Sequence, residues 1–197
     1  MAALTENFDS YTDGDLNGQG SWSGGTDFDI QGTTTQGGAK AVLHTAAASG
    51  SVSKSFTGAS TGVQSLYGRV ADTSDGTWSV RIGEAGAAKH YVKTNGGNVT
   101  YFDGATYATL GAISVDTWFQ IDIQWDAATD QARYRLNGGS WSAYASGVAT
   151  YTTLDTFILV KDNTSTGDAF WDTFTDGGAV QITTPRQRHT LLTLGVG

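Results

Sequence analysis

Residues 118–125 show the clearest alternation of apolar and polar positions in the chain. The apolar members stand at every second position and are Phe119, Ile121, Ile123 and Trp125. The polar members between them are Gln120, Asp122 and Gln124. Because successive side chains of a strand point to opposite faces, this pattern predicts a strand with one buried face and one face in water.

A second alternating segment follows a polar turn at residues 126–130. Its predicted inward side chains are Ala132, Tyr134 and Leu136, and its predicted outward side chains are Arg133 and Arg135. In an antiparallel hairpin the two arginines would face the Asp and Gln residues of the preceding strand, which favours cross-strand pairing. The segment ends in Asn-Gly-Gly at 137–139, residue types that tolerate the positive φ of a tight turn.

Short β-like segments bounded by Gly, Asn, Asp or Ser recur along the rest of the chain. Turn signals at intervals of about 8 to 12 residues favour a sandwich or a barrel. A first strand is predicted at 5–11, with Phe8 entering the core. Further strands are predicted at 27–31, 40–45, 51–56, 64–70, 77–82, 89–93, 99–102, 107–110, 156–160 and 169–174.

Composition supports a β fold. The 197 residues include 27 Gly but a single Pro, a balance that favours short strands and glycine-rich turns over helices. A chain of this length can bury a core large enough to be stable without disulfides or metals. There is no cysteine, which excludes disulfides and thiolate metal sites. We therefore predict an all-β, two-sheet antiparallel sandwich.

The charge divides the chain into a body and a tail. The net charge is -8, and all 19 acidic residues lie in 1–178. Residues 179–197 carry only basic charges and are predicted to form an extended C-terminal arm, which docks either on the sandwich or on a partner. The arm residues expected to make these contacts are Pro185, Arg186, Arg188, Leu191, Leu192 and Leu194. The acidic body argues against a nucleic-acid partner.

No apolar run approaches the roughly 18 residues of a membrane span. The first residues lack the basic and apolar regions of a signal peptide. We therefore expect neither a membrane-embedded protein nor one exported by a signal peptide.

Several segments combine predicted core aromatic residues with turn residues. They lie at 6–11, 14–19, Trp22, 118–126, 133–139 and 169–172. Together they resemble the concanavalin A-like lectin/glucanase superfamily, especially the laminin-G-like jelly rolls, over residues 4–176. The resemblance implies a jelly roll with two antiparallel sheets, one of them concave, and rim loops that often bind carbohydrate and sometimes calcium. These motifs are architectural, so they point to a fold rather than to an activity.

The glucanases of that superfamily carry a Glu-x-Asp-x-Glu strand, in which two carboxylates act on the glycosidic bond. The nearest match here is Gln120-Ile-Asp122-Ile-Gln124. Amides can neither protonate a leaving group nor attack an anomeric carbon. We therefore expect a protein that is not an enzyme, with a glycoside hydrolase or lyase that uses an unrelated carboxylate pair as the remaining alternative.

Calcium is the one cofactor that the sequence suggests. Carboxylates near the first and last predicted strands could converge on such an ion, and these are Asp9, Asp13, Asp15, Asp168 and Asp172. The alternative is that they are ordinary residues of solvated turns. No other cofactor is expected.

Sugar binding would use flat aromatic faces. The rings considered for this role are Trp22, Trp78, Tyr91, Tyr101, Tyr107, Trp141, Tyr144 and Tyr151. Most are expected in the core. Trp141 and Tyr144, which follow the glycine turn, are the predicted carbohydrate-binding residues.

A lectin-like sandwich without an export signal or cysteine is typical of a bacteriophage virion component, made in the bacterial cytoplasm and released by lysis. The first hypothesis is therefore a non-catalytic virion decoration or tail-associated protein, bound to itself or to other virion proteins through the arm, with host-surface glycans as a further ligand. The second is an extracellular carbohydrate-binding module of a bacterial polysaccharide-active protein. The third is a glycoside hydrolase or lyase.

Overall fold

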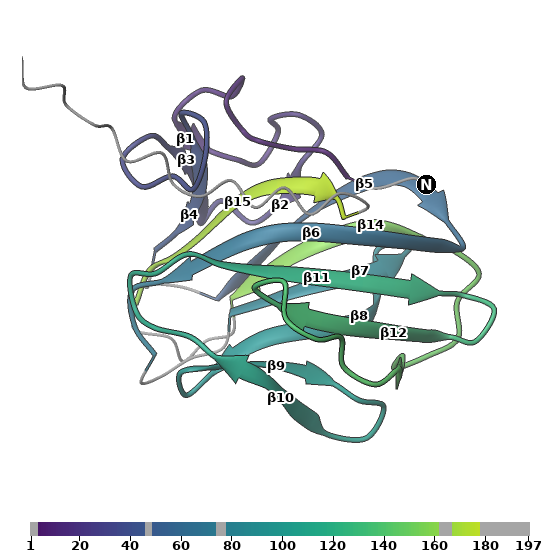
Figure 1. The fold of residues 1–197 in the computed structure, drawn as a ribbon. Coiled ribbons are helices and arrows are strands. Elements are labelled where there is room, and N and C mark those ends of the chain that lie inside the picture. Colours follow the sequence, from purple (N-terminus) through teal and green to yellow (C-terminus); the bar gives the residue numbers. More distant parts are fainter. Residues whose placement is uncertain (1–3, 46–48, 74–77, 162–166, 178–197) are drawn as a thin grey trace, which may run out of the picture.

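The computed structural model describes residues 4–45, 49–73, 78–161 and 167–177. They form two antiparallel β-sheets that pack around one hydrophobic core, and these residues contain no helix (Figure 1). The predicted all-β sandwich is confirmed. No helix that is long and apolar enough to cross a membrane is found in this part of the chain.

One sheet has eight strands. Their order across the sheet is β1 (Gly14–Asp15), β3 (Phe28–Gln31), β4 (Ala41–His44), β15 (Ala169–Asp176), β6 (Thr61–Val70), β11 (Phe119–Asp126), β12 (Gln131–Leu136) and β13 (Ala145–Ser146). The last long strand, β15, thus lies between two early strands, which ties the end of the described chain to its beginning.

The other sheet has seven strands. Their order is β10 (Tyr107–Ala112), β9 (Asn98–Phe102), β8 (Ala87–Asn95), β7 (Trp78–Glu84), β14 (Leu154–Lys161), β5 (Gly50–Ala59) and β2 (Ser23–Gly24). The chain moves repeatedly between the sheets, so neighbouring strands are often far apart in sequence.

The hairpin of β11 and β12 forms as its alternation predicts. The inward pairs are Ile121 with Leu136, Ile123 with Tyr134, and Trp125 with Ala132. On β6, which flanks β11, Gly62 faces Trp125, and a Cβ at Gly62 would lie 2.2 Å from the Trp125 ring. Only glycine leaves room there for the indole.

The prediction of a first strand at 5–11 is wrong. Glu6 forms a single bridge with Phe174, and the chain then turns because Phe8 adopts a φ of 62°. Phe8 is nevertheless fully buried, as the hydrophobic pattern predicts. A side chain can therefore reach the core from a turn as well as from a strand.

The other predicted strands exist, with shifted ends. β5 runs on to Ala59 and β8 covers Ala87–Asn95, both longer than predicted. The two-residue strands β1, β2 and β13 were not predicted, because segments so short carry no alternation.

A buried ion pair holds the first turn against the seven-stranded sheet. Lys54 Nζ of β5 lies 2.6 Å from Glu6 Oε2, and the two side chains are 16% and 8% exposed. Burial alone would raise the pKa of Glu6, but the hydrogen bonds from Lys54 and Tyr11 and the Lys54 charge together hold it below its ordinary value. The pair thus connects the first turn to β5.

His90 makes the stability of the fold depend on pH. Its ring lies in the core between the hydroxyls of Tyr134 and Tyr151, at 3.0 and 3.1 Å. Burial lowers the pKa of His90 from 6.5 to about 4. Since the folded pKa lies below the unfolded one, stability is complete above pH 6.5 and falls as the pH drops toward 4, by about 3 kcal/mol in all.

This loss is measured by urea unfolding at pH 7.5 and pH 4.5, with His90→Gln as the comparison. The variant is expected to show a flatter pH dependence than the parent between these values. Equal slopes for the two proteins would show that His90 is not the group responsible.

Candidate functional site

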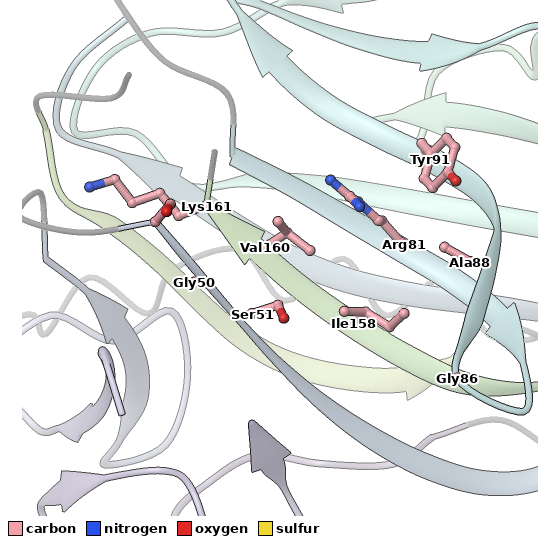
Figure 2. A pocket seen from close by; sticks show the side chains of 10 residues that line it. Gly50, Ser51, Arg81, Gly86, Ala88, Tyr91, Ile158, Val160 and Lys161 are labelled. Carbon is pink, nitrogen blue, oxygen red and sulfur yellow. The ribbon is translucent and has the colours of Figure 1, made fainter. Parts of the chain in front are cut away.

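A hollow of about 530 Å³ lies on the outer face of the seven-stranded sheet. Figure 2 shows residues of β5, β14, β7 and β8 around it. Its principal side chains are Ser51, Arg81, Tyr91, Ile158, Val160 and Lys161. The hollow is open to solvent and its lining mixes hydrogen-bond donors with apolar surface, which is the general character of a small-ligand site.

The hollow belongs to a row of side chains that crosses six strands. The row is set by the strand register and by ring contacts, and it consists of Ser53, Ile158, Arg81, Tyr91, Phe102 and Tyr107. At about 4.8 Å between neighbouring strands, the row is about 24 Å long. This length suits an extended ligand rather than a compact one.

One half of the row is aromatic. The Tyr91 and Phe102 rings lie 6.2 Å apart, and the Phe102 and Tyr107 rings lie 5.6 Å apart, in both cases edge to face. Arg81 lies 5.2 Å from the Tyr91 ring, and Lys93 Nζ lies 3.6 Å from the Tyr107 ring. Because Tyr107 is 45% exposed, this strip offers ring surface to solvent next to cationic donors.

No carboxylate is among the described residues that line the hollow. Hydrolysis of a glycosidic bond generally needs two carboxyl groups on either side of it. The donors present are the guanidinium of Arg81 and the Ser51 hydroxyl, whereas the Lys161 ammonium is buried near Thr45 O and the Trp78 ring. This set can bind hydroxyl and acidic oxygens, but it offers no acid and base pair.

The predicted residues Trp141 and Tyr144 lie on the opposite sheet. They follow β12, and Arg133 lies 5.0 Å from both rings. Arg135 lies 4.5 Å from the Trp141 ring, and Tyr144 is 48% exposed. The sandwich therefore presents two aromatic and basic surfaces, one on each sheet, and only this one was predicted from the sequence.

Asp122, the central residue of the motif in β11 that resembles the glucanase strand, stabilises the fold. Asp122 is fully buried and accepts hydrogen bonds from Ser65, from Gln120 Nε2 at 2.8 Å and from Arg135 Nε at 2.5 Å. Gln124 Oε1 accepts a hydrogen bond from Arg133 Nε at 2.7 Å. The predicted cross-strand pairing of acid and amide with arginine is confirmed. The prediction that this face lies in water is wrong at Asp122, which is buried by these contacts.

Among the described residues no group of three or more metal-ligating side chains occurs. Of the predicted calcium ligands, Asp9 accepts backbone hydrogen bonds from Ala39 and Lys40, and Asp13 pairs with Lys40 at 2.9 Å. Asp15 accepts from the backbone of its own turn, Asp168 precedes β15, and Asp172 accepts from the backbone of residues 36 and 37.

Burial raises the pKa of Asp172, although its hydrogen bonds act in the opposite direction. Asp9 holds the backbone of a turn, which is the role that the turn-residue alternative describes. Asp172 does not fit that alternative, because it is a fully buried residue of β15. The arm residues Pro185, Arg186, Arg188, Leu191, Leu192 and Leu194 lie outside the described residues.

Tyr91 is one of the eight rings considered for sugar binding but not one of the two predicted to bind it, and Arg81 is not predicted from the sequence. The usable signal was the alternation in β8, where Lys89, Tyr91 and Lys93 stand at every second position opposite the buried His90 and Val92. The pairing of β8 with β7, which brings Tyr91 beside Arg81, follows from the register alone.

No protein-family model matches the sequence, and no curated protein matches it. Several solved structures resemble the fold. A sialidase superposes with a TM-score of 0.70 at 8% identity, over 90% of this chain and 19% of its own. A Bacillus licheniformis β-glucanase superposes with a TM-score of 0.57 at 10% identity, over 88% of this chain and 97% of its own.

The binding domain of botulinum neurotoxin serotype D superposes with a TM-score of 0.57 at 12% identity, over 88% of this chain and 47% of its own. The chain thus spans about a fifth of the sialidase and about half of the neurotoxin structure. At these identities the likeness concerns the fold alone. The fold is the concanavalin A-like jelly roll that the sequence motifs resemble.

Proposed function

We propose that this protein binds carbohydrate on the outer face of its seven-stranded sheet and does not cleave it. The observation that carries the proposal is the row of side chains through the hollow, from Ser53 to Tyr107. It joins hydroxyl and guanidinium donors to a strip of rings over about 24 Å, with about 4.8 Å between strands. Sugar rings stack on aromatic faces and hydrogen-bond through their edges, so both kinds of surface are needed side by side.

The structural neighbours support this class of ligand. A β-glucanase and a sialidase are carbohydrate-active by their names, and the fold resembles nearly all of the former and about a fifth of the latter. Because one fold hosts many functions, this support is by analogy only. The geometry of the hollow carries the proposal independently of it.

The lining of the hollow is also the basis for proposing that the protein does not cleave its ligand. The described lining offers no carboxylate, and Asp122 on the other sheet is buried in hydrogen bonds. Incubation with a panel of polysaccharides is expected to release no reducing ends and no unsaturated products. Release of either product would overturn this part of the proposal.

The first binding prediction concerns Tyr91. Tyr91→Ala removes the ring that connects Arg81 to the aromatic strip. For a neutral oligosaccharide identified on a glycan array, the variant is expected to bind about tenfold more weakly, which corresponds to about 1.4 kcal/mol. Isothermal titration calorimetry measures the change.

The matched control is Tyr144→Ala, which removes a 48% exposed ring from the opposite sheet. Its affinity for the same oligosaccharide is expected to stay within about twofold of the parent. If the two variants behave alike, or if the array shows no bound glycan, the hollow is not the binding site.

The virion role and the division at 178/179 remain predictions, because they rest on an arm outside the described residues. Mass spectrometry of purified phage particles tests the first of them. Particles that lack this chain would remove the virion hypothesis and leave the binding module as the biological setting.

A further inference from the structure

Two arginines on the outer face of the eight-stranded sheet, Arg133 and Arg135, hydrogen-bond to the described residues of the protein through Nε alone. Arg133 Nε donates to Gln124 and Arg135 Nε donates to Asp122. Within the part of the chain that the structure describes, their Nη groups donate no hydrogen bond to protein. Each guanidinium is therefore fixed in place with its terminal donors directed to solvent or to a ligand.

Rings fix the same arginines from the side. Arg133 lies between Trp141 and Tyr144, and Arg135 lies against Trp141. The segment that carries the rings is itself bound to β12, since Ser142 N donates to Tyr134 O at 2.7 Å and Tyr134 N donates to Ser142 Oγ at 3.0 Å. We refer to Arg133, Arg135, Trp141 and Tyr144 as the arginine–aromatic cluster.

The cluster is locally positive on a chain with a net charge of -8. Of its two guanidinium groups, that of Arg135 is paired with the fully buried Asp122, whereas that of Arg133 is bound to the neutral amide of Gln124. Arg135 is itself only 15% exposed, so its charge is poorly screened. The two guanidinium groups carry one positive charge more than Asp122 neutralises. Their pre-organised terminal forks match an oxyanion, which can accept two parallel hydrogen bonds from each fork.

We propose that the arginine–aromatic cluster is a second binding site, and that its ligand is an acidic glycan. The carboxylate or sulfate group binds the free Nη edges of Arg133 and Arg135, and the sugar ring stacks on the exposed face of Tyr144. This site lies on the opposite sheet from the hollow and does not depend on it. A jelly roll with two such faces can hold two chains of a polysaccharide at once.

The test uses three probes of similar size: a galacturonic acid tetrasaccharide, a heparin-derived tetrasaccharide and neutral maltotetraose. Binding is followed at low salt by calorimetry and by the NMR signals of the arginine Nε–H and Trp141 indole N–H groups. At least one acidic probe is expected to shift the signals of Arg133, Arg135 and Trp141. Arg133→Gln is expected to weaken its binding at least tenfold.

Arg69→Gln is the matched control. Arg69 lies on the same face of the same sheet, 4.9 Å from the Phe170 ring, but its Nη2 already donates to Asp116 at 2.6 Å. Its replacement is expected to change affinity by less than about twofold. Arg133→Lys keeps the charge without the fork, and an intermediate loss is expected from it.

The possible results distinguish a carboxylate from a sulfate ligand, and binding at the cluster from binding at the hollow. Binding of only the galacturonate or only the heparin probe identifies carboxylate or sulfate as the ligand group. Equal binding of maltotetraose, an unaffected Arg133→Gln variant, or no binding of either acidic probe would overturn the proposal. Tyr91→Ala is expected to leave the Arg133 and Trp141 signals responsive, so failure of the hollow and failure of this cluster are distinguished.

Discussion

Asp122→Ala is expected to lower the free energy of unfolding by about 3–5 kcal/mol, among the largest effects of any single substitution in this chain. Asp122 has no solvent exposure and accepts from Ser65, Gln120 and Arg135. Its removal leaves the Arg135 guanidinium with an unpaired charge in a site that is only 15% exposed. Guanidinium chloride unfolding at neutral pH measures the loss.

Asp122→Asn is the control, because it keeps the shape and one acceptor oxygen while removing the charge. Its loss is expected to be smaller than that of the alanine variant. A change of less than about 0.5 kcal/mol for Asp122→Ala would show that the carboxylate is not structural, and would reopen a chemical role for it.

Trp125→Ala is expected to cost a similar amount, about 3–5 kcal/mol, through the cavity that it leaves. The indole is 1% exposed, lies over Gly62, and donates from Nε1 to the Ala59 carbonyl at 3.0 Å. The variant removes both the packing and the donor. Thermal unfolding followed by near-ultraviolet circular dichroism measures the loss.

Trp141→Ala serves as the comparison because it removes the same side chain from a partly exposed position beside β12. A loss of less than about 1 kcal/mol is expected there. Equal losses at Trp125 and Trp141 would contradict the two-layer core, since they would place both rings in the same environment.

Strands with strict alternation could be predicted from the sequence. β11 and β12 form with the predicted inward residues. A one-residue shift in the pairing register would expose Ile121, Ile123 and Trp125 to solvent. The failure at residues 5–11 has a local cause. Phe8 reaches the core from a turn with a φ of 62°, a conformation that alternation does not report.

The hollow could not be predicted, for a topological reason. Its row takes one residue from each of six strands, and β14 lies between β5 and β7 only in the folded sheet. The same limit applies to the predicted calcium residues. Asp13 and Asp15 are close in sequence, yet Asp13 pairs with Lys40 while Asp15 holds its own turn.

The central claim is that glycan binds uncleaved on the seven-stranded sheet. Amide NMR spectra during titration with an array-identified neutral oligosaccharide test it most directly. We predict shifts that concentrate at Ser51, Arg81, Tyr91 and Ile158, with no change in the spectrum of the sugar over time. Shifts confined to the other sheet, or the growth of new anomeric signals from cleaved product, would contradict it.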